Sequence, residues 1–325
     1  MWKLPADKLS KKDILKRRWL IAAVMNLALV MVVMGVSSVN VALPTLVRDL
    51  GASGKELQWI VNSYALVFAG MLLTMGAVGD RFGRRRAFFA GLGIYAVASA
   101  FSAFAGSPTE LIAWRGIMGI GAALIMPATL SIITNVFPVK DRAKAVAMWA
   151  GFAGAGASIG PVVSGLLLNS FWWGSIFLFL IPVIAVTAAL TYLYVPTSKD
   201  PEEQALDWGG SLFSMIGLGA LLYGIIEGPE AGWSSPAFGI SMIIAFAAFF
   251  EFIKWERRTS HPMLPLNFFR SRMFSVSSMV ILLSFFSMFG LFFVLAQYLQ
   301  FVQGDSPLAA AVKMLPLAAT FVAFS

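Results

Sequence analysis

The sequence predicts an all-α polytopic membrane protein, and three observations support this fold class. The 325 residues are 59% hydrophobic and only 12% charged, whereas soluble domains carry about 25% charged residues. Several apolar runs reach the roughly 20 residues that a helix needs to span a bilayer. Segments of alternating polarity, which are typical of a transmembrane β-barrel, do not occur. A bundle of membrane-spanning helices is therefore expected.

The apolar pattern predicts ten spans. The first run is longer than the apolar region of a signal peptide, which has about 7–15 residues, and no convincing cleavage site follows it. We therefore expect it to be retained behind a short basic arm. The predicted spans cover residues 20–43, 57–78, 88–105, 110–134, 143–167, 171–195, 208–227, 237–256, 273–298 and 307 to the end of the sequence.

The distribution of Lys and Arg predicts the orientation. With the N-terminus inside, the predicted inner segments hold 20 Lys and Arg residues, whereas the outer loops hold only Arg48 and Lys55. Cytoplasmic loops carry such an excess in membrane proteins. We expect a cytoplasmic N-terminus in the plasma (inner) membrane, with residues 79–87 and 257–272 inside and residues 44–56 and 228–236 outside.

Several function classes are disfavoured. The chain has no cysteine and one histidine, His261, so disulfides and Cys/His zinc sites are excluded. We interpret His261 as a loop residue rather than part of a Ser–His–Asp hydrolase. No G-x-x-x-x-G-K-[ST] phosphate loop occurs. The net charge of +8 lies beside apolar spans and favours the lipid bilayer over nucleic acid as a partner. We expect no enzyme, metal or cofactor.

One short turn carries unusually concentrated charge. Residues 79–86 contain one aspartate and four arginines between two apolar spans. Membrane topology accounts for the arginines, but not for Asp80 or for the glycines at 76, 79 and 83. Glycine permits close backbone approach and positive φ. An aspartate among arginines can form charge-assisted hydrogen bonds.

Residues 76–85, GAVGDRFGRR, resemble the loop signature of the major facilitator superfamily, which also lies between the second and third helices. The resemblance implies a cytoplasmic gate, in which charged side chains make and break contacts as two helical bundles rock. The alternative is that this loop serves topology alone. The gate residues implied are Gly76, Asp80, Arg81, Gly83, Arg84 and Arg85.

Two more runs are similar to signatures of this superfamily. Residues 115–121, RGIMGIG, resemble its fourth-helix motif and imply that Arg115 and Gly119 border a central cavity. An arginine inside a membrane usually faces a cavity or a partner; snorkelling to the interface is the alternative. Residues 156–165 resemble the fifth-helix antiporter signature. That match implies roles for Gly156, Gly160, Pro161 and Gly165, where small residues admit a neighbouring helix and proline bends its own.

Residues 39–44, VNVALP, close the predicted first span and resemble the fourteen-helix drug:proton antiporters. Asn40 matches that pattern, but Gly35 stands where the family carries an aspartate. The proton-carrying residue is therefore open, and the acceptors for Arg115 would be Asn40, Ser37, Ser38 or substrate. This makes an anionic or zwitterionic substrate more plausible here than in family members that retain the aspartate, while drug-like cations remain the expectation that the resemblance implies. We interpret Glu227 and Glu251 as interfacial.

The resemblance also implies a domain order. A cytoplasmic basic arm (1–19) precedes an N-terminal six-helix bundle (20–195), a short cytoplasmic linker (196–207) and two additional helices (208–256). A cytoplasmic loop (257–272) leads to the start of a C-terminal bundle (273–325). Because the resemblance implies fourteen helices, we expect a partial sequence.

The function that follows is secondary active, proton-coupled export of amphipathic small molecules. It would operate by alternating access in a monomer, with protons and a small amphipathic substrate as partners. The energy source would be the proton gradient, without a cofactor. A non-transporting membrane sensor, or an inactive fragment of a transporter, is the alternative.

Overall fold

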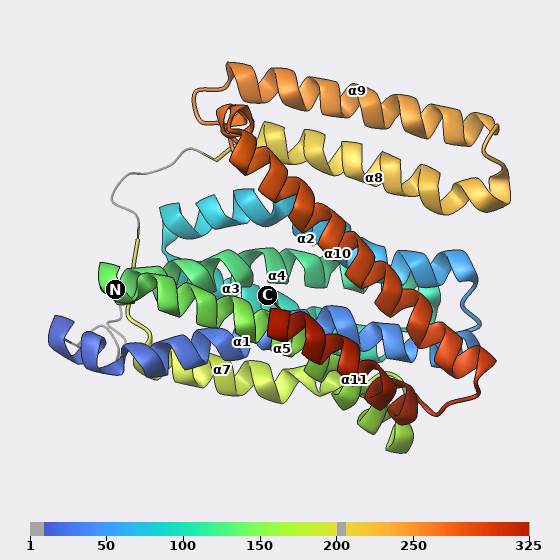
Figure 1. Ribbon diagram of the computed structural model, residues 1–325, viewed down its shortest axis with the longest axis horizontal. Coiled ribbons are helices and arrows are strands. Elements are labelled where there is room, and N and C mark those ends of the chain that lie inside the picture. Colours follow the sequence, from blue (N-terminus) through green and yellow to red (C-terminus); the bar gives the residue numbers. More distant parts are fainter. Residues whose placement is uncertain (1–9, 200–205, 325) are drawn as a thin grey trace.

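The computed structural model describes residues 10–199 and 206–324, and its regular elements are helices (Figure 1). The first nine residues of the expected basic arm, residues 200–205 of the expected linker, and Ser325 lie outside this description. The helices are α1 (Lys11–Leu50), α2 (Gly54–Phe82), α3 (Arg84–Ala103), α4 (Pro108–Val136), α5 (Val139–Ser170), α6 (Ser175–Leu178), α7 (Leu180–Tyr194), α8 (Trp208–Ala231), α9 (Pro236–Arg258), α10 (Arg272–Gln297) and α11 (Pro307–Phe324).

Eight helical segments in the described residues are long and apolar enough to cross a membrane. They are α1 to α5, the α6–α7 pair taken together, α8 and α9. Helices α10 and α11 occupy the positions of the ninth and tenth predicted spans. The fold is therefore all-α, as the composition and apolar runs predict.

Helix α1 is longer at both ends than the predicted span of residues 20–43. It begins in the basic arm, where the Ser10 hydroxyl accepts a hydrogen bond from the amide of Asp13 and the Asp13 carboxylate accepts one from the amide of Ser10. This capping box supplies acceptors to amides that lack partners within the helix. The helix does not end at Pro44 but runs through it to Leu50. It ends where Gly51 takes the left-handed conformation, φ 65°.

The helices α1 to α7 form one bundle, in which α1 packs on α5 and α4 packs on both α2 and α3. Its main core includes the fully buried aromatic side chains of Tyr64, Phe88, Tyr95, Phe137 and Phe177. Two ends of the bundle can be distinguished. We call the end that contains the α2–α3 turn the arginine-rich end, and the end that contains Gly51 the opposite end.

Helices α8 and α9 pack against each other as an antiparallel hairpin beside α2, at the top of the view in Figure 1. From the hairpin, α10 crosses the bundle diagonally toward the opposite end. It continues into one π-helical turn, η3 (Tyr298–Val302). Helix α11 then turns back and packs on α5. The hairpin and α11 therefore pack on different helices of the first seven, the hairpin on α2 and α11 on α5.

Candidate functional site

The arginine-rich turn is almost entirely helical. Helix α2 continues to Phe82 and α3 begins at Arg84, so Gly83 alone separates them. The prediction of an eight-residue turn at 79–86 is therefore wrong, because both helices extend into it. Gly83 has φ 107°, a backbone conformation that residues with a Cβ rarely adopt. Glycine at this position allows the two helices to reverse direction within one residue.

Asp80 connects three helices at this turn. Its Oδ1 accepts from Arg84 Nε at 2.7 Å and from the Ser131 hydroxyl of α4 at 3.3 Å. Arg84 also reaches the Ser131 carbonyl, at 3.5 Å. The Asp80 and Arg84 side chains are 26% and 14% exposed. This partly shielded pair links the last turn of α2, the first turn of α3 and the C-terminal part of α4.

Arg85 and the backbone of Arg84 fasten the same turn to the chain that follows α7. Arg85 is buried, and its Nη1 donates to the Val195 carbonyl at 2.6 Å. The Arg84 amide donates to the Ser198 carbonyl at 3.0 Å. The start of the expected linker therefore lies against the gate sequence, which the sequence pattern did not indicate.

Two further residues that the resemblance assigns to a gate, Gly76 and Arg81, have simpler surroundings. Gly76 faces Pro127 of α4, where an added Cβ would lie 3.4 Å from the proline Cβ. The Arg81 guanidinium lies 5.5 Å from the ring centroid of its neighbour Phe82, which is 54% exposed. The structure thus gathers Gly76, Asp80, Gly83, Arg84 and Arg85 in packed positions, and Arg81 is half-buried beside the exposed Phe82.

Arg115 is fully buried between α1 and α2. Its Nη1 donates to the Gly35 carbonyl at 2.9 Å and its Nε to the Ile60 carbonyl at 3.1 Å. Its guanidinium carbon lies 4.5 Å from the Tyr64 ring centroid. The snorkelling alternative is wrong for this conformation, because the side chain is 0% exposed. For the same reason it does not border an open cavity.

The side chains expected to accept hydrogen bonds from Arg115 do not do so. The hydroxyls of Ser37 and Ser38 instead donate to the carbonyls of Gly156 and Gly160 on α5, at 3.5 and 3.2 Å. Asn40 is 5% exposed, and its Oδ1 has no hydrogen-bond partner among the described residues. Backbone carbonyls, rather than these side chains, hold the guanidinium.

The close fit around Arg115 depends on glycine. A Cβ at Gly119 would lie 2.7 Å from the Tyr64 carbonyl oxygen, so α2 and α4 meet closely there. A Cβ at Gly35 would collide with the hydroxyl of Tyr95. The space of the family's aspartate side chain is therefore occupied by the tip of a buried tyrosine.

The glycines of α5 bring it against two helices. A Cβ at Gly156 would lie 3.1 Å from Val30 Cα, and one at Gly160 would lie 3.2 Å from Met34 Cα. Gly165 faces α11 instead, where a Cβ would lie 2.8 Å from Leu308 Cα. Pro161 lies inside the helix and is buried. Gly156 and Gly160 thus serve the α1 contact, and Gly165 serves α11.

A cavity of about 670 Å³ lies at the arginine-rich end, between α2, α4 and the segment after α9. Its lining includes Asp80, Trp149, Asp207 and His261. His261 does lie in a loop, as expected, but it faces the same cavity as the gate aspartate. Sequence reasoning missed this, since 181 positions separate the two residues and no motif relates them.

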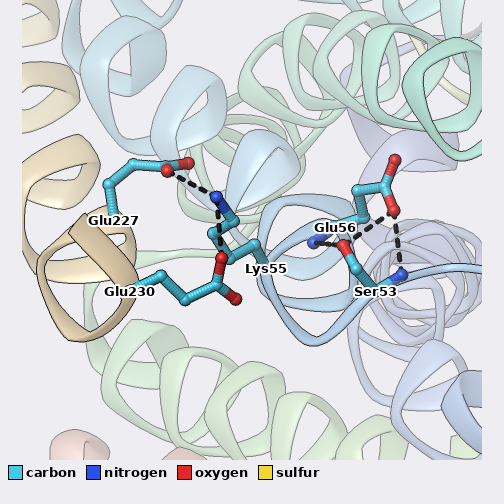
Figure 2. Close-up of polar contacts among 5 residues, drawn as sticks. All are labelled: Ser53, Lys55, Glu56, Glu227 and Glu230. Atoms are coloured by element: carbon cyan, nitrogen blue, oxygen red, sulfur yellow. Dashed lines mark hydrogen bonds and ion pairs between the residues drawn. The ribbon is translucent and has the colours of Figure 1, made fainter.

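Figure 2 shows an ion-pair cluster at the opposite end of the bundle. Lys55 Nζ lies 2.9 Å from Glu227 Oε2 and 3.0 Å from Glu230 Oε2. Beside it, Ser53 and Glu56 form the capping box that begins α2. Lys55 thereby joins α2 to the end of α8. The sequence interpretation of Glu227 as an interfacial residue did not include this ion pair.

Comparisons with known proteins agree with these motifs. Residues 25–325 match the family model described as Major Facilitator Superfamily. The chain is 36% identical over 302 residues to the methyl viologen resistance protein SmvA of Salmonella typhimurium, covering 93% of this chain and 61% of that protein. It is 34% identical over 301 residues to the multidrug efflux pump LfrA of Mycolicibacterium smegmatis, covering 92% and 60%.

A third relative is the multidrug resistance protein Stp of Mycobacterium tuberculosis, 33% identical over 295 residues, which cover 90% of this chain and 55% of that protein. The chain therefore spans between 55% and 61% of the length of these three relatives. The similarity extends over nearly all of the described helices.

Proposed function

We propose that this chain, which belongs to the Major Facilitator Superfamily, exports amphipathic small molecules by proton-coupled secondary transport. Three similar proteins are named for methyl viologen resistance, multidrug efflux and multidrug resistance. The absence of a phosphate-loop motif agrees with an energy source other than ATP hydrolysis. Export driven by the proton gradient is the function that these features support best.

The observation that carries this proposal is the set of contacts around Asp80. One carboxylate oxygen accepts from α3 and α4 at once, while Arg85 secures the same turn to Val195. These are short polar contacts between the ends of separate helices. All of them lie within the bundle of α1 to α7, so they hold the turn as one piece that moves with this bundle, and the gate closes where this piece meets the second bundle.

The proposal includes an orientation and a substrate contact. The N-terminus and the arginine-rich end lie on the cytoplasmic side of the plasma membrane, and the protein acts as a monomer. Arg115 Nη2 is buried without a hydrogen-bond acceptor among the described residues. An acidic or zwitterionic group on the substrate supplies that acceptor when the helices part.

Inverted membrane vesicles from an efflux-deficient bacterium that produces this chain test the proposal. We expect a protonophore-sensitive uptake of a fluorescent amphiphile into these vesicles, which corresponds to export from the cell. An anionic and a cationic amphiphile of similar size are compared, with vesicles that lack the chain as the control. Equal uptake with and without the chain would support the alternative, a sensor or an inactive fragment.

A further inference from the structure

Two carboxyl groups meet at the open end of the α8–α9 hairpin. Asp207 caps the start of α8, and Glu256 lies in the last turn of α9. They are 7% and 4% exposed, so both carboxyl groups are buried. Gly210 marks where they converge: a Cβ there would lie 2.6 Å from Glu256 Oε1 and 2.8 Å from Asp207 Oδ2.

Three of the four carboxylate oxygens have amide or indole donors. Asp207 Oδ1 accepts from the Gly210 amide at 2.8 Å and from the Trp255 indole at 2.6 Å. Asp207 Oδ2 accepts from the Met263 amide at 3.4 Å, and Glu256 Oε2 from the Leu264 amide at 2.9 Å. Glu256 Oε1 is buried and has no donor among the described residues.

The charge of the two carboxyl groups bears on why Glu256 Oε1 has no hydrogen-bond donor. An ionised carboxylate only accepts hydrogen bonds, so two ionised groups cannot bond to each other. Neither Asp207 nor Glu256 forms an ion pair with Lys or Arg in the part of the chain that the structure describes. Two adjacent buried negative charges without a cation are costly, whereas one added proton provides the missing donor.

We propose that Asp207 and Glu256 share one proton, held between Glu256 Oε1 and Asp207 Oδ2, and that this pair is a proton-binding site of the chain. The proton makes one group a hydroxyl donor and leaves the other an acceptor, so the hydrogen bond is satisfied. The proton belongs to the pair rather than to either residue. This site is separate from the Arg115 region and is not required by the proposed export.

The surrounding charges leave the pair without a compensating cation. On α9, Lys254 pairs with Glu251 at 2.7 Å, and Arg257 and Arg258 are exposed. Across the cavity that Asp207 borders lie Asp80 of α2 and His261 of the following loop. No described ion pair joins any of these groups to Asp207 or Glu256, so the shared proton is what removes one of the pair's two negative charges.

The proton fastens the hairpin to its neighbours. The Asp207 carbonyl accepts from the Thr74 hydroxyl of α2 at 3.4 Å, and the Ser211 hydroxyl donates to the Gly70 carbonyl at 3.0 Å. The two carboxyl groups hold the amides of Met263 and Leu264 on the other side. Loss of the proton places two anions in contact, and their repulsion loosens this junction.

Infrared difference spectroscopy of the purified chain, titrated with pH, tests the site. We expect the carbonyl stretch of a protonated carboxylic acid at neutral pH, and its loss in Glu256→Gln, where the amide NH₂ replaces the hydroxyl donor. Asp207→Asn shifts the band because the proton then faces an amide. The matched control is Glu251→Gln on the same helix, which is 46% exposed and paired with Lys254, and it leaves the band unchanged.

Two results would overturn the proposal: no protonated carboxyl in the wild-type chain at neutral pH, or a band that persists in Glu256→Gln and is unmoved in Asp207→Asn. Circular dichroism identifies variants that do not fold. If Glu256→Gln is unfolded, the band shift in Asp207→Asn decides. The measurement needs no transport, so its failure is distinguishable from a failure of the proposed export.

Discussion

Arg115 donates from Nη1 to the backbone carbonyl of Gly35 across 2.9 Å. A residue without a side chain thus supplies the acceptor at the position where the resemblance leads one to expect an aspartate. The Tyr95 hydroxyl fills the space of the missing side chain. The guanidinium is therefore held by peptide dipoles and by the Tyr64 ring, without a carboxylate contact in the described residues.

Any side chain at position 35 should disturb this arrangement. We expect Gly35→Ala to lower the free energy of unfolding by about 1–3 kcal/mol, because overfilling a packed core displaces side chains. Gly93→Ala on α3 is the control, since a Cβ there meets nothing within 4 Å. Thermal unfolding in detergent measures both. The double variant Gly35→Ala, Tyr95→Phe should recover stability, and a failure to recover would show that Tyr95 is not the obstacle.

The gate proposal predicts a functional cost at Asp80. Asp80→Asn removes the charge-assisted bond from Arg84 while membrane insertion is retained. A partly exposed pair contributes about 1 kcal/mol or less, and a coupling of 1 kcal/mol corresponds to about a fivefold change. We expect the initial uptake rate into inverted vesicles to fall by about that factor, at equal protein content.

Arg84→Gln should have a similar effect, and the double variant should add little to either single change. Arg86→Gln is the control: this arginine is exposed and has no described ion pair. Unchanged uptake in Asp80→Asn would mean that Asp80 has no role in transport beyond membrane topology.

The α5 contacts predict a position-specific effect on export. Gly160→Ala forces its methyl group against the Ser37 hydroxyl and the Met34 backbone of α1. We expect lower uptake, since α1 and α5 can no longer approach closely. Gly151→Ala, on the same helix, meets nothing within 4 Å and should retain the wild-type rate. Equal rates for the two variants would contradict a role for the close contact.

The orientation is tested by labelling. The chain has no cysteine, so a single introduced cysteine is a unique target. Ser234 and Ser260 are both exposed, in the loops before α9 and after it. An impermeant maleimide applied to intact cells should label Ser234→Cys and label Ser260→Cys only after permeabilisation. The opposite result would invert the proposed topology.

Much of the fold could be predicted because hydropathy is a local property. The all-α class follows from the composition and the apolar runs. The helix ends were less predictable. Pro44 lies within α1 because a membrane helix tolerates a missing amide donor when its surroundings compensate, and the capping at Ser10 extends the helix into the basic arm.

The site could be predicted only where a motif is contiguous. The contiguous motif indicated the residues of the expected gate, but not the Val195 carbonyl that binds Arg85, since that contact joins segments 110 positions apart. Likewise, no pattern places Asp207 beside Glu256, or His261 in the cavity with Asp80. The acceptors of Arg115 are backbone carbonyls, which every residue carries, so side-chain identity could not reveal them.

Proton exchange for substrate is tested most directly by the pH gradient itself. Inverted vesicles that contain the chain are energised until a pH-sensitive dye reports a stable, acid interior, and the transported amphiphile is then added. Antiport predicts an immediate partial loss of the gradient, saturable with substrate and reduced in Asp80→Asn. Substrate uptake that leaves the gradient unchanged, relative to vesicles without the chain, would contradict proton-coupled export.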